Sequence, residues 1–185
     1  IFSILAIRDQ VAPATLNLEK PSRESAIDRV AKEPQPRKMS RDTRRAQLIE
    51  ATIETLALRG YARTTLTEVA RTAGLSHGLV NFHFDTKEKL LSETLALLAE
   101  EYRQNWQAYL ERAGTDPAAQ LAALLLADFD PAICTPARLS AWCSFWGEAQ
   151  SRPLYQAQCG ANDAAYNACI AEICGQLLAQ GRYED

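Results

Sequence analysis

A single glycine, Gly74, separates two short stretches whose apolar residues recur at helical spacing. Glycine adopts left-handed backbone angles without a steric penalty, so it permits a sharp turn between helices. Before it, Thr65 and Glu68 have the spacing of a capping box, in which the hydroxyl bonds the Glu68 amide and the carboxylate reaches back to the cap. The apolar face that follows consists of Leu66, Val69, Ala70 and Ala73. After the glycine, Ser76 is the expected cap of another short helix that runs to about His83.

Helical periodicity continues on both sides of this turn. An upstream helix, closed by Gly60, has its apolar face at Leu48, Ile49, Thr52, Ile53 and Leu56. A long downstream helix, capped by Asp85 or Thr86, carries the apolar seam Leu91, Leu95, Leu98, Tyr102, Trp106 and Tyr109. Three more helices are expected where a capping residue precedes a proline: at Asp116-Pro117, Thr135-Pro136 and Ser151-Arg152-Pro153. No stretch alternates as a strand would, so the predicted fold class is all-α.

The two short helices and their glycine turn have the geometry of a helix-turn-helix, whose second helix enters the major groove of DNA. An ordinary helical hairpin has the same spacing, so spacing alone leaves both interpretations open. The charges favour nucleic acid. Residues 37–89 hold ten Lys and Arg against six Asp and Glu, whereas residues 90–185 hold five against twelve. The net charge of −3 therefore conceals a basic segment followed by an acidic one, as expected for a DNA-facing module on an acidic body.

Other functional classes lack their characteristic residues. The only two histidines, His77 and His83, have no acidic or serine partner placed for a hydrolytic triad, and no Gly-x-Ser-x-Gly motif or phosphate loop is present, so we assign no catalytic residue. The five cysteines are odd in number and lack Cys-x-x-Cys spacing, which favours reduced thiols over a metal site: Cys134, Cys143, Cys159, Cys169 and Cys174. We expect no enzyme, no cofactor and no membrane segment, and a cytoplasmic location.

The segment around the turn resembles the signature of the TetR family of regulators. The similarity runs from Gly60 to Gly78 (GYARTTLTEVARTAGLSHG) and continues from Phe82 to Leu90 (FHFDTKEKL). The resemblance implies a three-helix N-terminal DNA-binding domain and a C-terminal helical body for ligand binding and dimerisation. It also implies a homodimeric repressor that binds double-stranded palindromic operator DNA and releases it when a small molecule enters the body.

This resemblance assigns DNA contacts to individual residues. Four occupy recognition-helix positions that face base edges: His77, Gly78, Leu79 and Asn81. Two match positions that hold phosphates: Thr65 and Lys87. Asn81 could bond adenine through both amide atoms, and Lys87 stands where a helix N-terminus attracts anions. Many relatives carry tyrosine in place of Asn81, so a tyrosine–phosphate contact is not transferred. The whole expected set is Arg44, Arg45, Thr64, Thr65, Ser76, His77, Gly78, Leu79, Asn81, Phe82, His83 and Lys87.

In the body, residues 128–131 (DFDP) precede residues 136–146 (PARLSAWCSFW), where two tryptophans share one helical face. This stretch resembles the BetI-type branch of the family, repressors of glycine betaine synthesis that respond to choline. A quaternary ammonium cannot be hydrogen-bonded, so its binding needs aromatic faces within about 6 Å. The expected ligand-binding residues are Tyr102, Trp106, Tyr109, Asp128, Trp142, Phe145 and Trp146, with Asp130 and Glu148 as alternative counter-charges. Alternatively, these aromatic residues are simply core between the fourth and sixth helices.

Three regions follow from these assignments. Residues 1–38 contain four prolines and are expected to be poorly ordered, either as an N-terminal arm or as an upstream translation, because Met39 is the only methionine. Residues 39–85 are the expected DNA-binding domain. Residues 86–185 are the expected regulatory domain, which we expect to be C-terminally incomplete because TetR-like proteins usually dimerise through two further helices. The resemblance implies that full-length protein is a homodimer in the bacterial cytoplasm, associated with the nucleoid.

Three alternatives to a choline-responsive repressor stay open at the level of sequence. A TetR-type repressor could respond to another small molecule, such as a drug or a lipid metabolite. An enzyme, for example a hydrolase, would need catalytic residues that the motifs do not supply. A ligand-binding or adaptor protein could keep this fold after losing DNA binding.

Overall fold

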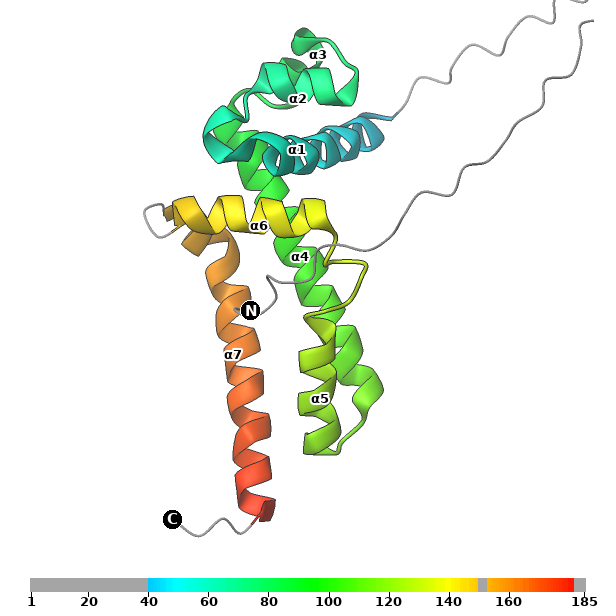
Figure 1. Cartoon of the computed structure of the whole chain (residues 1–185), viewed down its shortest axis with the longest axis vertical. Helices are drawn as coiled ribbons and strands as arrows, with labels where there is room; N and C mark the ends of the chain where they lie inside the picture. Colours follow the sequence, from blue (N-terminus) through cyan, green and yellow to red (C-terminus); the bar gives the residue numbers. More distant parts are fainter. Residues whose placement is uncertain (1–39, 150–152, 182–185) are drawn as a thin grey trace, which may run out of the picture. The chain divides into compact units, whose positions relative to one another are not determined.

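The computed structural model describes residues 40–149 and 153–181, which form seven α-helices and no strand, confirming the all-α prediction. The helices are α1 (Arg41–Arg63), α2 (Leu66–Ala73), α3 (His77–His83), α4 (Lys87–Ala113), α5 (Pro117–Ala127), α6 (Pro136–Ala149) and α7 (Pro153–Gly181) (Figure 1). The expectations for residues 1–38 lie outside the described residues. No helix in the described ranges is long and apolar enough to cross a bilayer.

The helices begin where their capping residues predict. The Thr65 hydroxyl accepts a hydrogen bond from the Glu68 amide at 3.2 Å, and the Ser76 hydroxyl accepts one from the Leu79 amide at 3.3 Å. Thr86 rather than Asp85 caps α4. The three proline starts are confirmed at α5, α6 and α7, although the capping pair before α7 lies outside the described residues. These helix starts are local features, so short-range sequence is enough to place them.

Two glycines mark the ends predicted for α1 and α2. Gly74 has φ 66° and ψ 31°, and its amide donates to the carbonyls of Ala70 and Arg71, which closes α2 in the left-handed conformation. Gly60 also has a positive φ, 73°, but the chain makes one more turn beyond it. The predicted end of α1 is therefore a kink, and the helix ends at Arg63.

The first three helices and the start of α4 share one hydrophobic cluster: Leu48, Ala51, Val69, Ala70, Val80, Phe84 and Leu90. Polar bonds reinforce it. The Gln47 side chain donates to the Ala73 carbonyl at 3.2 Å. Arg45 donates to the His83 carbonyl at 2.7 Å, pairs with Glu93 of α4 and stacks on the ring of Phe84. The helix-turn-helix is thus held to both of its neighbouring helices.

The remaining helices form two further clusters. In the one called the first cluster below, α6 packs on α1 and against parts of α4 and α7. This cluster contains Ile53, Leu56, Leu91, Leu95, Leu98, Ala99, Ala141, Phe145 and Cys159. In the one called the second cluster, α4, α5 and α7 pack together around Trp106, Leu124, Ala127 and Ile173. Figure 1 shows α5 and α7 alongside the C-terminal half of α4. The second cluster lies on the part of α4 away from the helix-turn-helix.

The conformation of Gly74 leads to a stability prediction. Gly74→Ala should lower the free energy of unfolding by about 1–2 kcal/mol, because a β-carbon is unfavourable at this positive φ. No atom lies within 4 Å of the added carbon, so the effect isolates backbone strain. Gly175→Ala is the matched control, since it also has open space but sits inside α7 with ordinary helical angles. It should raise stability by about 0.5–1 kcal/mol, as urea unfolding can measure. Equal effects of the two variants would contradict this account.

Candidate functional site

The outer face of α3 is polar and open to solvent. His77, Gly78 and Asn81 are exposed, and Phe82 keeps 69% of its surface accessible. On the inner face Val80 is fully buried in the cluster shared with α1 and α2. The helix is therefore anchored by its apolar side while its other side presents hydrogen-bonding groups, as base-edge readout requires.

Two of the residues expected at DNA are buried instead. Thr64 is 1% exposed, and its hydroxyl donates to the Gly60 carbonyl at 2.9 Å. His83 is 6% exposed, with its imidazole edge-on to Phe82, and its Nδ1 finds no partner in the part of the chain that the structure describes. Burial lowers the pKa of His83, and the nearby arginines lower it further, which favours the neutral imidazole. The structure does not present either side chain on the surface beside α3.

The cationic side chains of the expected set have partners within the protein. The Lys87 ammonium donates to the carbonyls of Tyr61 and Ala62, at 3.0 and 3.4 Å, and lies over the Tyr61 ring. It thereby joins the start of α4 to the last turn of α1. Arg44 donates to the Gln47 side chain at 2.6 Å, and Arg45 bonds the His83 carbonyl and pairs with Glu93. Thr65 and Ser76 are exposed and Leu79 is half-buried, so these three border the α3 surface.

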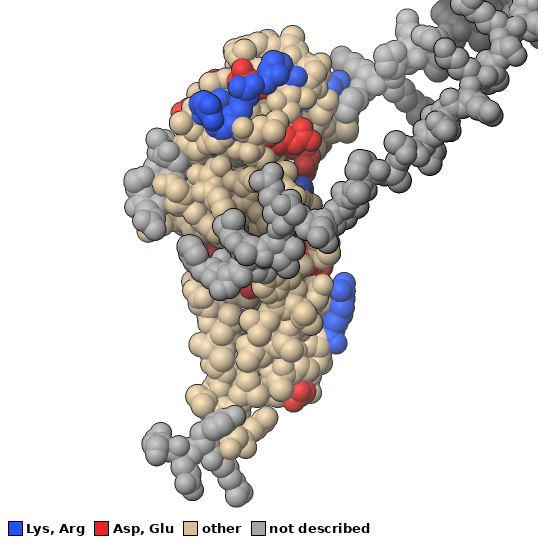
Figure 2. Space-filling model, viewed as in Figure 1, with Lys and Arg blue, Asp and Glu red and all other residues tan. Residues whose placement is uncertain are grey.

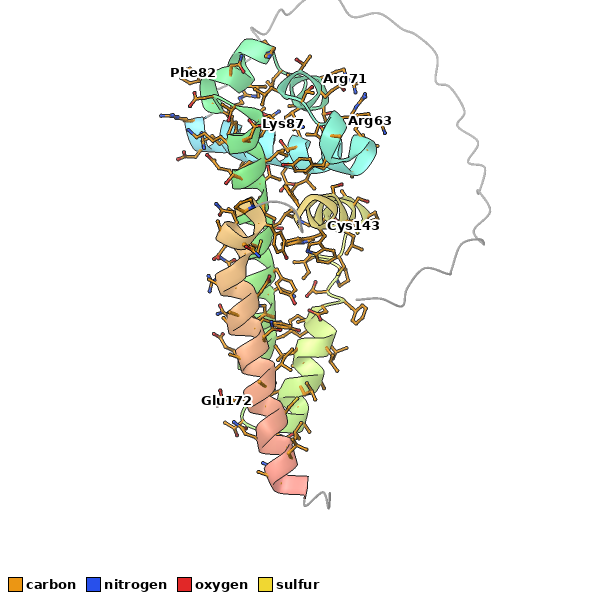
Figure 3. The ribbon with its side chains drawn as sticks, turned by 90° about the vertical axis from the view of Figure 1, so that its left-hand side faces the viewer. Arg63, Arg71, Phe82, Lys87, Cys143 and Glu172 are labelled. Carbon is orange, nitrogen blue, oxygen red and sulfur yellow. The ribbon has the colours of Figure 1, made fainter. Side chains whose placement is uncertain are left out.

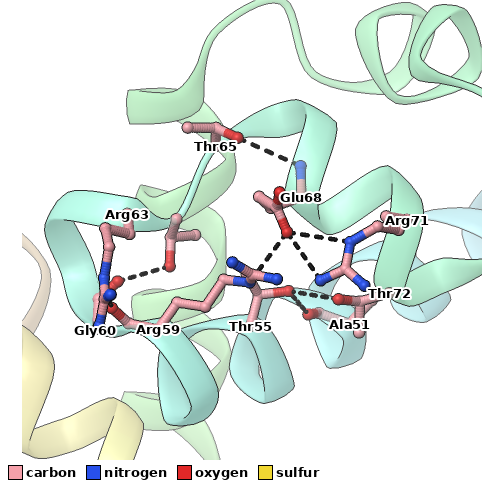
Figure 4. A network of polar contacts seen from close by, with 10 residues as sticks. Ala51, Thr55, Arg59, Gly60, Arg63, Thr65, Glu68, Arg71 and Thr72 are labelled. Atoms are coloured by element: carbon pink, nitrogen blue, oxygen red, sulfur yellow. Dashed lines mark hydrogen bonds and ion pairs between the residues drawn. The ribbon is translucent and has the colours of Figure 1, made fainter.

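Two arginines that the sequence motif did not single out, Arg59 and Arg71, lie beside Glu68 (Figure 4). The Glu68 carboxylate pairs with Arg59 of α1 and Arg71 of α2, each at 2.9 Å. This pairing lowers the pKa of Glu68. The capping-box prediction was therefore half wrong: the amide bond to Thr65 forms, but the carboxylate turns to the arginines. The three-residue spacing of Glu68 and Arg71 was the available signal.

On the face shown in Figure 2, Lys and Arg side chains gather mainly over the end formed by α1 to α3, with acidic side chains among them. Figure 3 places Phe82, Lys87, Arg63 and Arg71 together at the end formed by α1 to α3, and Glu172 near the far end of α7. The basic end and the exposed face of α3 therefore coincide, in agreement with the charge segregation along the sequence.

The aromatic residues expected to bind the ligand divide between two hydrophobic clusters, apart from Trp146. In the second cluster the Tyr102 hydroxyl donates to Asp128 Oδ1 at 2.9 Å, and the Tyr109 hydroxyl donates to Asp130 Oδ2 at 2.9 Å. Trp106 is 4% exposed, and its indole N–H has no partner among the described residues. The carboxylates stand at the end of α5, opposite the aromatic face of α4.

Tyr166 of α7 completes this arrangement, although the sequence motif did not include it. Its hydroxyl lies 3.3 and 3.4 Å from the two carboxylate oxygens of Asp128. Its ring centroid is 5.6 Å from that of Tyr102 and 5.5 Å from that of Trp106. The helical spacing of Tyr166, Ile170 and Ile173 marked this face of α7 as packed, but nothing local indicated which carboxylate it would meet.

The other expected ligand residues lie on α6: Phe145 and Trp142 belong to the first cluster, whereas Trp146 is 39% exposed at its edge. The rings of Trp142 and Trp146 are 6.0 Å apart, and the Trp146 indole donates to the Tyr155 hydroxyl at 3.1 Å. Phe145 is buried edge-on against Tyr61 of α1. The structure thus does not assemble all seven residues into one cage. Of the alternative counter-charges, the side chain of Glu148 lies outside the described residues.

A cavity of about 380 Å³ lies beyond Trp106, at the far end of the body. Its lining consists of Leu110, Thr115, Gln120, Cys169, Glu172, Ile173 and Gln176. None of the expected ligand residues lines it, but Leu110, Cys169 and Ile173 also belong to the cluster around Trp106. Among the described residues, no group of three or more His, Cys, Asp and Glu is placed to hold a metal ion.

Arg138 connects three helices and was also missed by the motif. It forms two bonds of 2.8 Å to Glu101 of α4 and one of 3.0 Å to Glu50 of α1. Its side chain is 18% exposed, and these carboxylates raise its pKa. The first turn of α6 is thus tied electrostatically to the body and to the helix that carries the helix-turn-helix.

Removing this tie should be destabilising. Arg138→Ala should lower the free energy of unfolding by about 1–3 kcal/mol, because Glu101 loses a largely desolvated, two-bond partner. The control is Arg103→Ala, which breaks a pair with Glu100 on the surface of α4 alone and should have a much smaller effect. Chemical denaturation compares the two, and a larger loss for the Arg103 variant would contradict the assigned role.

Family models match both parts of the chain. The model described as "Bacterial regulatory proteins, tetR family" matches residues 48–94, which contain α2, α3 and the flanking parts of α1 and α4. The model described as "BetI-type transcriptional repressor, C-terminal" matches residues 117–185. The two motifs singled out in the sequence therefore fall within or beside the matched regions.

Curated relatives share the name HTH-type transcriptional regulator BetI. The protein from Paraburkholderia xenovorans is 37% identical over 121 residues, which cover 64% of this chain and 60% of the relative. The protein from Stenotrophomonas maltophilia is 33% identical over 142 residues, which cover 77% of this chain and 71% of the relative. The chain thus matches about 60% of the length of the first relative.

Solved structures have the same fold. A transcriptional regulator from Pseudomonas aeruginosa PAO1 matches with a TM-score of 0.68 and 26% identity, over 80% of this chain and 71% of that one. A regulator from Saccharomonospora viridis, solved in complex with choline, matches with a TM-score of 0.66 and 22% identity, over 78% and 74%. The tetR family model, the curated relatives and the Pseudomonas aeruginosa structure are all described as regulators, in line with the expectation of a regulator rather than an enzyme.

Proposed function

The chain belongs to the TetR family of bacterial regulatory proteins, and from this we propose that it represses transcription by binding a palindromic operator as a homodimer. The observation that carries the proposal is the α3 surface, where exposed His77, Gly78 and Asn81 stand on a helix anchored by buried Val80. Two such helices related by a two-fold axis would read two half-sites about one helical turn apart.

We further propose that choline is the effector and that the controlled genes convert choline to glycine betaine. The BetI names of the relatives and the choline complex of the Saccharomonospora viridis regulator support this choice. The body supplies aromatic rings and a carboxylate at the end of α5, which suit a quaternary ammonium. Release would follow if choline binds better to a conformation that DNA does not select.

The direct test is a choline titration of the operator complex. Choline should weaken binding of the chain to its operator, measured by fluorescence anisotropy at fixed salt concentration, while binding to random duplex should change little. Glycine betaine is the comparison ligand, because its own carboxylate is repelled by the acidic residues at the end of α5. Operator binding that does not respond to choline would leave a repressor with another effector. Absence of specific DNA binding would reject the proposed function itself.

Asn81 should contribute to sequence specificity. Asn81→Ala should cost about 1–3 kcal/mol of binding to the cognate operator and relax the preference at one base pair per half-site. The side chain is exposed on α3, so the change should leave the fold intact. Binding measured on operators varied at single positions gives the answer, and equal weakening on cognate and random DNA would argue against base readout.

Lys87 should contribute to affinity without specificity. Lys87→Ala should weaken binding to all sequences alike and reduce the slope of log K against log salt by about one. To reach a phosphate, the ammonium must exchange its bonds to the carbonyls of α1. Lys89→Ala is the control, since Lys89 lies one half-turn further along α4 and pairs with Asp85. A sequence-selective loss with an unchanged salt slope would contradict this role.

A further inference from the structure

The carboxylate of Asp128 has no cationic partner among the described residues. Its contacts are two tyrosine hydroxyls: Tyr102 at 2.9 Å, and Tyr166 at 3.3 and 3.4 Å. The ion pairs of the described ranges all involve other acids, namely Glu50, Glu68, Asp85, Glu93, Glu100 and Glu101. A half-buried carboxylate whose side-chain partners among the described residues are two phenols is a favourable place for a positive charge that these residues do not provide.

The walls beside this carboxylate are aromatic. The rings of Tyr102 and Trp106 on α4 both lie within 6 Å of the ring of Tyr166 on α7, with centroid distances of 5.6 and 5.5 Å. The faces of such rings attract a cation within about 6 Å. Burial raises the pKa of both tyrosines, so the hydroxyls stay protonated and continue to donate to Asp128.

Trp106 provides an independent indication of a ligand. Its indole N–H is buried, with 4% of the side chain exposed, and has no acceptor among the described groups. A buried donor without an acceptor is unfavourable, so an acceptor atom next to it would be stabilising. The cavity at the far end of the body shares Leu110, Cys169 and Ile173 with this cluster, although Trp106 itself does not line it.

We propose that Tyr102, Trp106, Asp128 and Tyr166 form the effector site, that its ligand is a quaternary ammonium bearing a hydroxyl, and that the Tyr166 hydroxyl holds the place of the cation in the free protein. This inference rests on the proposed effector response. Asp128 receives the cation, the rings surround its methyl groups, and the ligand oxygen accepts from the Trp106 indole. The Tyr166 bonds are longer than the Tyr102 bond, so the Tyr166 bonds are the ones that the ligand replaces.

This exchange would act on the position of α7. Tyr102 belongs to α4 and Asp128 ends α5, whereas Tyr166 is the contact from α7 to this carboxylate. Replacing that contact with a ligand removes this polar link between α7 and the α4–α5 pair, while the apolar packing around Ile173 remains. The Trp142 and Trp146 pair on α6 has no role in this site, and neither does the Tyr109–Asp130 pair, which lies next to it.

Calorimetry on the whole chain with choline tests the assignment. Asp128→Asn should weaken choline binding by about tenfold or more, because the counter-charge is lost. The matched control Asp130→Asn should change it by about twofold at most, since that carboxylate lies outside the site. The uncharged analogue 3,3-dimethylbutan-1-ol should bind the wild type far more weakly than choline does. Equal binding of choline to Asp128→Asn and wild type, or loss of binding in Trp146→Leu alone, would overturn the proposal.

Two further variants test the roles of the individual groups. Tyr166→Phe keeps the ring and removes the competing hydroxyl, so choline should bind about threefold more tightly, whereas Tyr109→Phe should leave binding unchanged. Trp106→Phe should weaken choline more than tetramethylammonium, which has no acceptor oxygen. Weaker choline binding in Tyr166→Phe would overturn the exchange, and equal losses for the two ligands in Trp106→Phe would overturn the indole contact.

The outcomes separate this site from the proposed function. Thermal melts of each variant show whether a loss of binding reflects unfolding. No heat with millimolar choline or tetramethylammonium on the folded wild type overturns the site, while specific operator binding by the same sample keeps the repressor. Choline binding that depends on Asp128 without any effect on the operator complex supports the site and rejects the effector role.

Discussion

Helix α1 buries side chains in two hydrophobic clusters, and the arrangement of the other helices depends on this double burial. Leu48 and Ala51 pack with α2 and α3, whereas Ile53 and Leu56 pack with α4, α6 and α7. A fully buried leucine or isoleucine contributes about 1.5–3 kcal/mol relative to an exposed one. Because one helix serves both clusters, a rotation of the helix-turn-helix also changes the packing of α6. Arg138 adds an electrostatic tie at the same junction.

Helix α4 is the second continuous link between the two proposed sites. It begins at Lys87 beside the last turn of α1, passes through the first cluster at Leu95, and presents Tyr102 and Trp106 to the second. A ligand shifts a conformational equilibrium only by its difference in affinity for the two states. The exchange at Asp128 would supply that difference, and α4 and α1 would carry it to the surface of α3.

The charges of the DNA-facing end are less available than the sequence count suggests. Arg45 holds His83 and Glu93, Arg59 and Arg71 share Glu68, and Lys87 bonds main-chain carbonyls. Several of these cations therefore stabilise the fold, and a phosphate must compete for those that also face DNA. The exposed Asn81 of α3 has no such competing side-chain bond within the described ranges, which is why specificity and affinity are assigned to different residues.

The sequence alone was sufficient for the features whose causes are local. Capping residues and prolines act on backbone groups within four residues. The starts of α2 at Thr65, of α3 at Ser76 and of α5 to α7 at their prolines, and the end of α2 at Gly74, are therefore as predicted. The family resemblance could also be recognised from sequence, because each of its motifs is a continuous stretch of residues. The contacts of Glu68 with Arg59, of Arg138 with Glu50, and of Asp128 with Tyr166 were decided only by the tertiary structure. Each joins side chains from different helices, and the packing of those helices, not the order of their residues, determines which charges and rings meet.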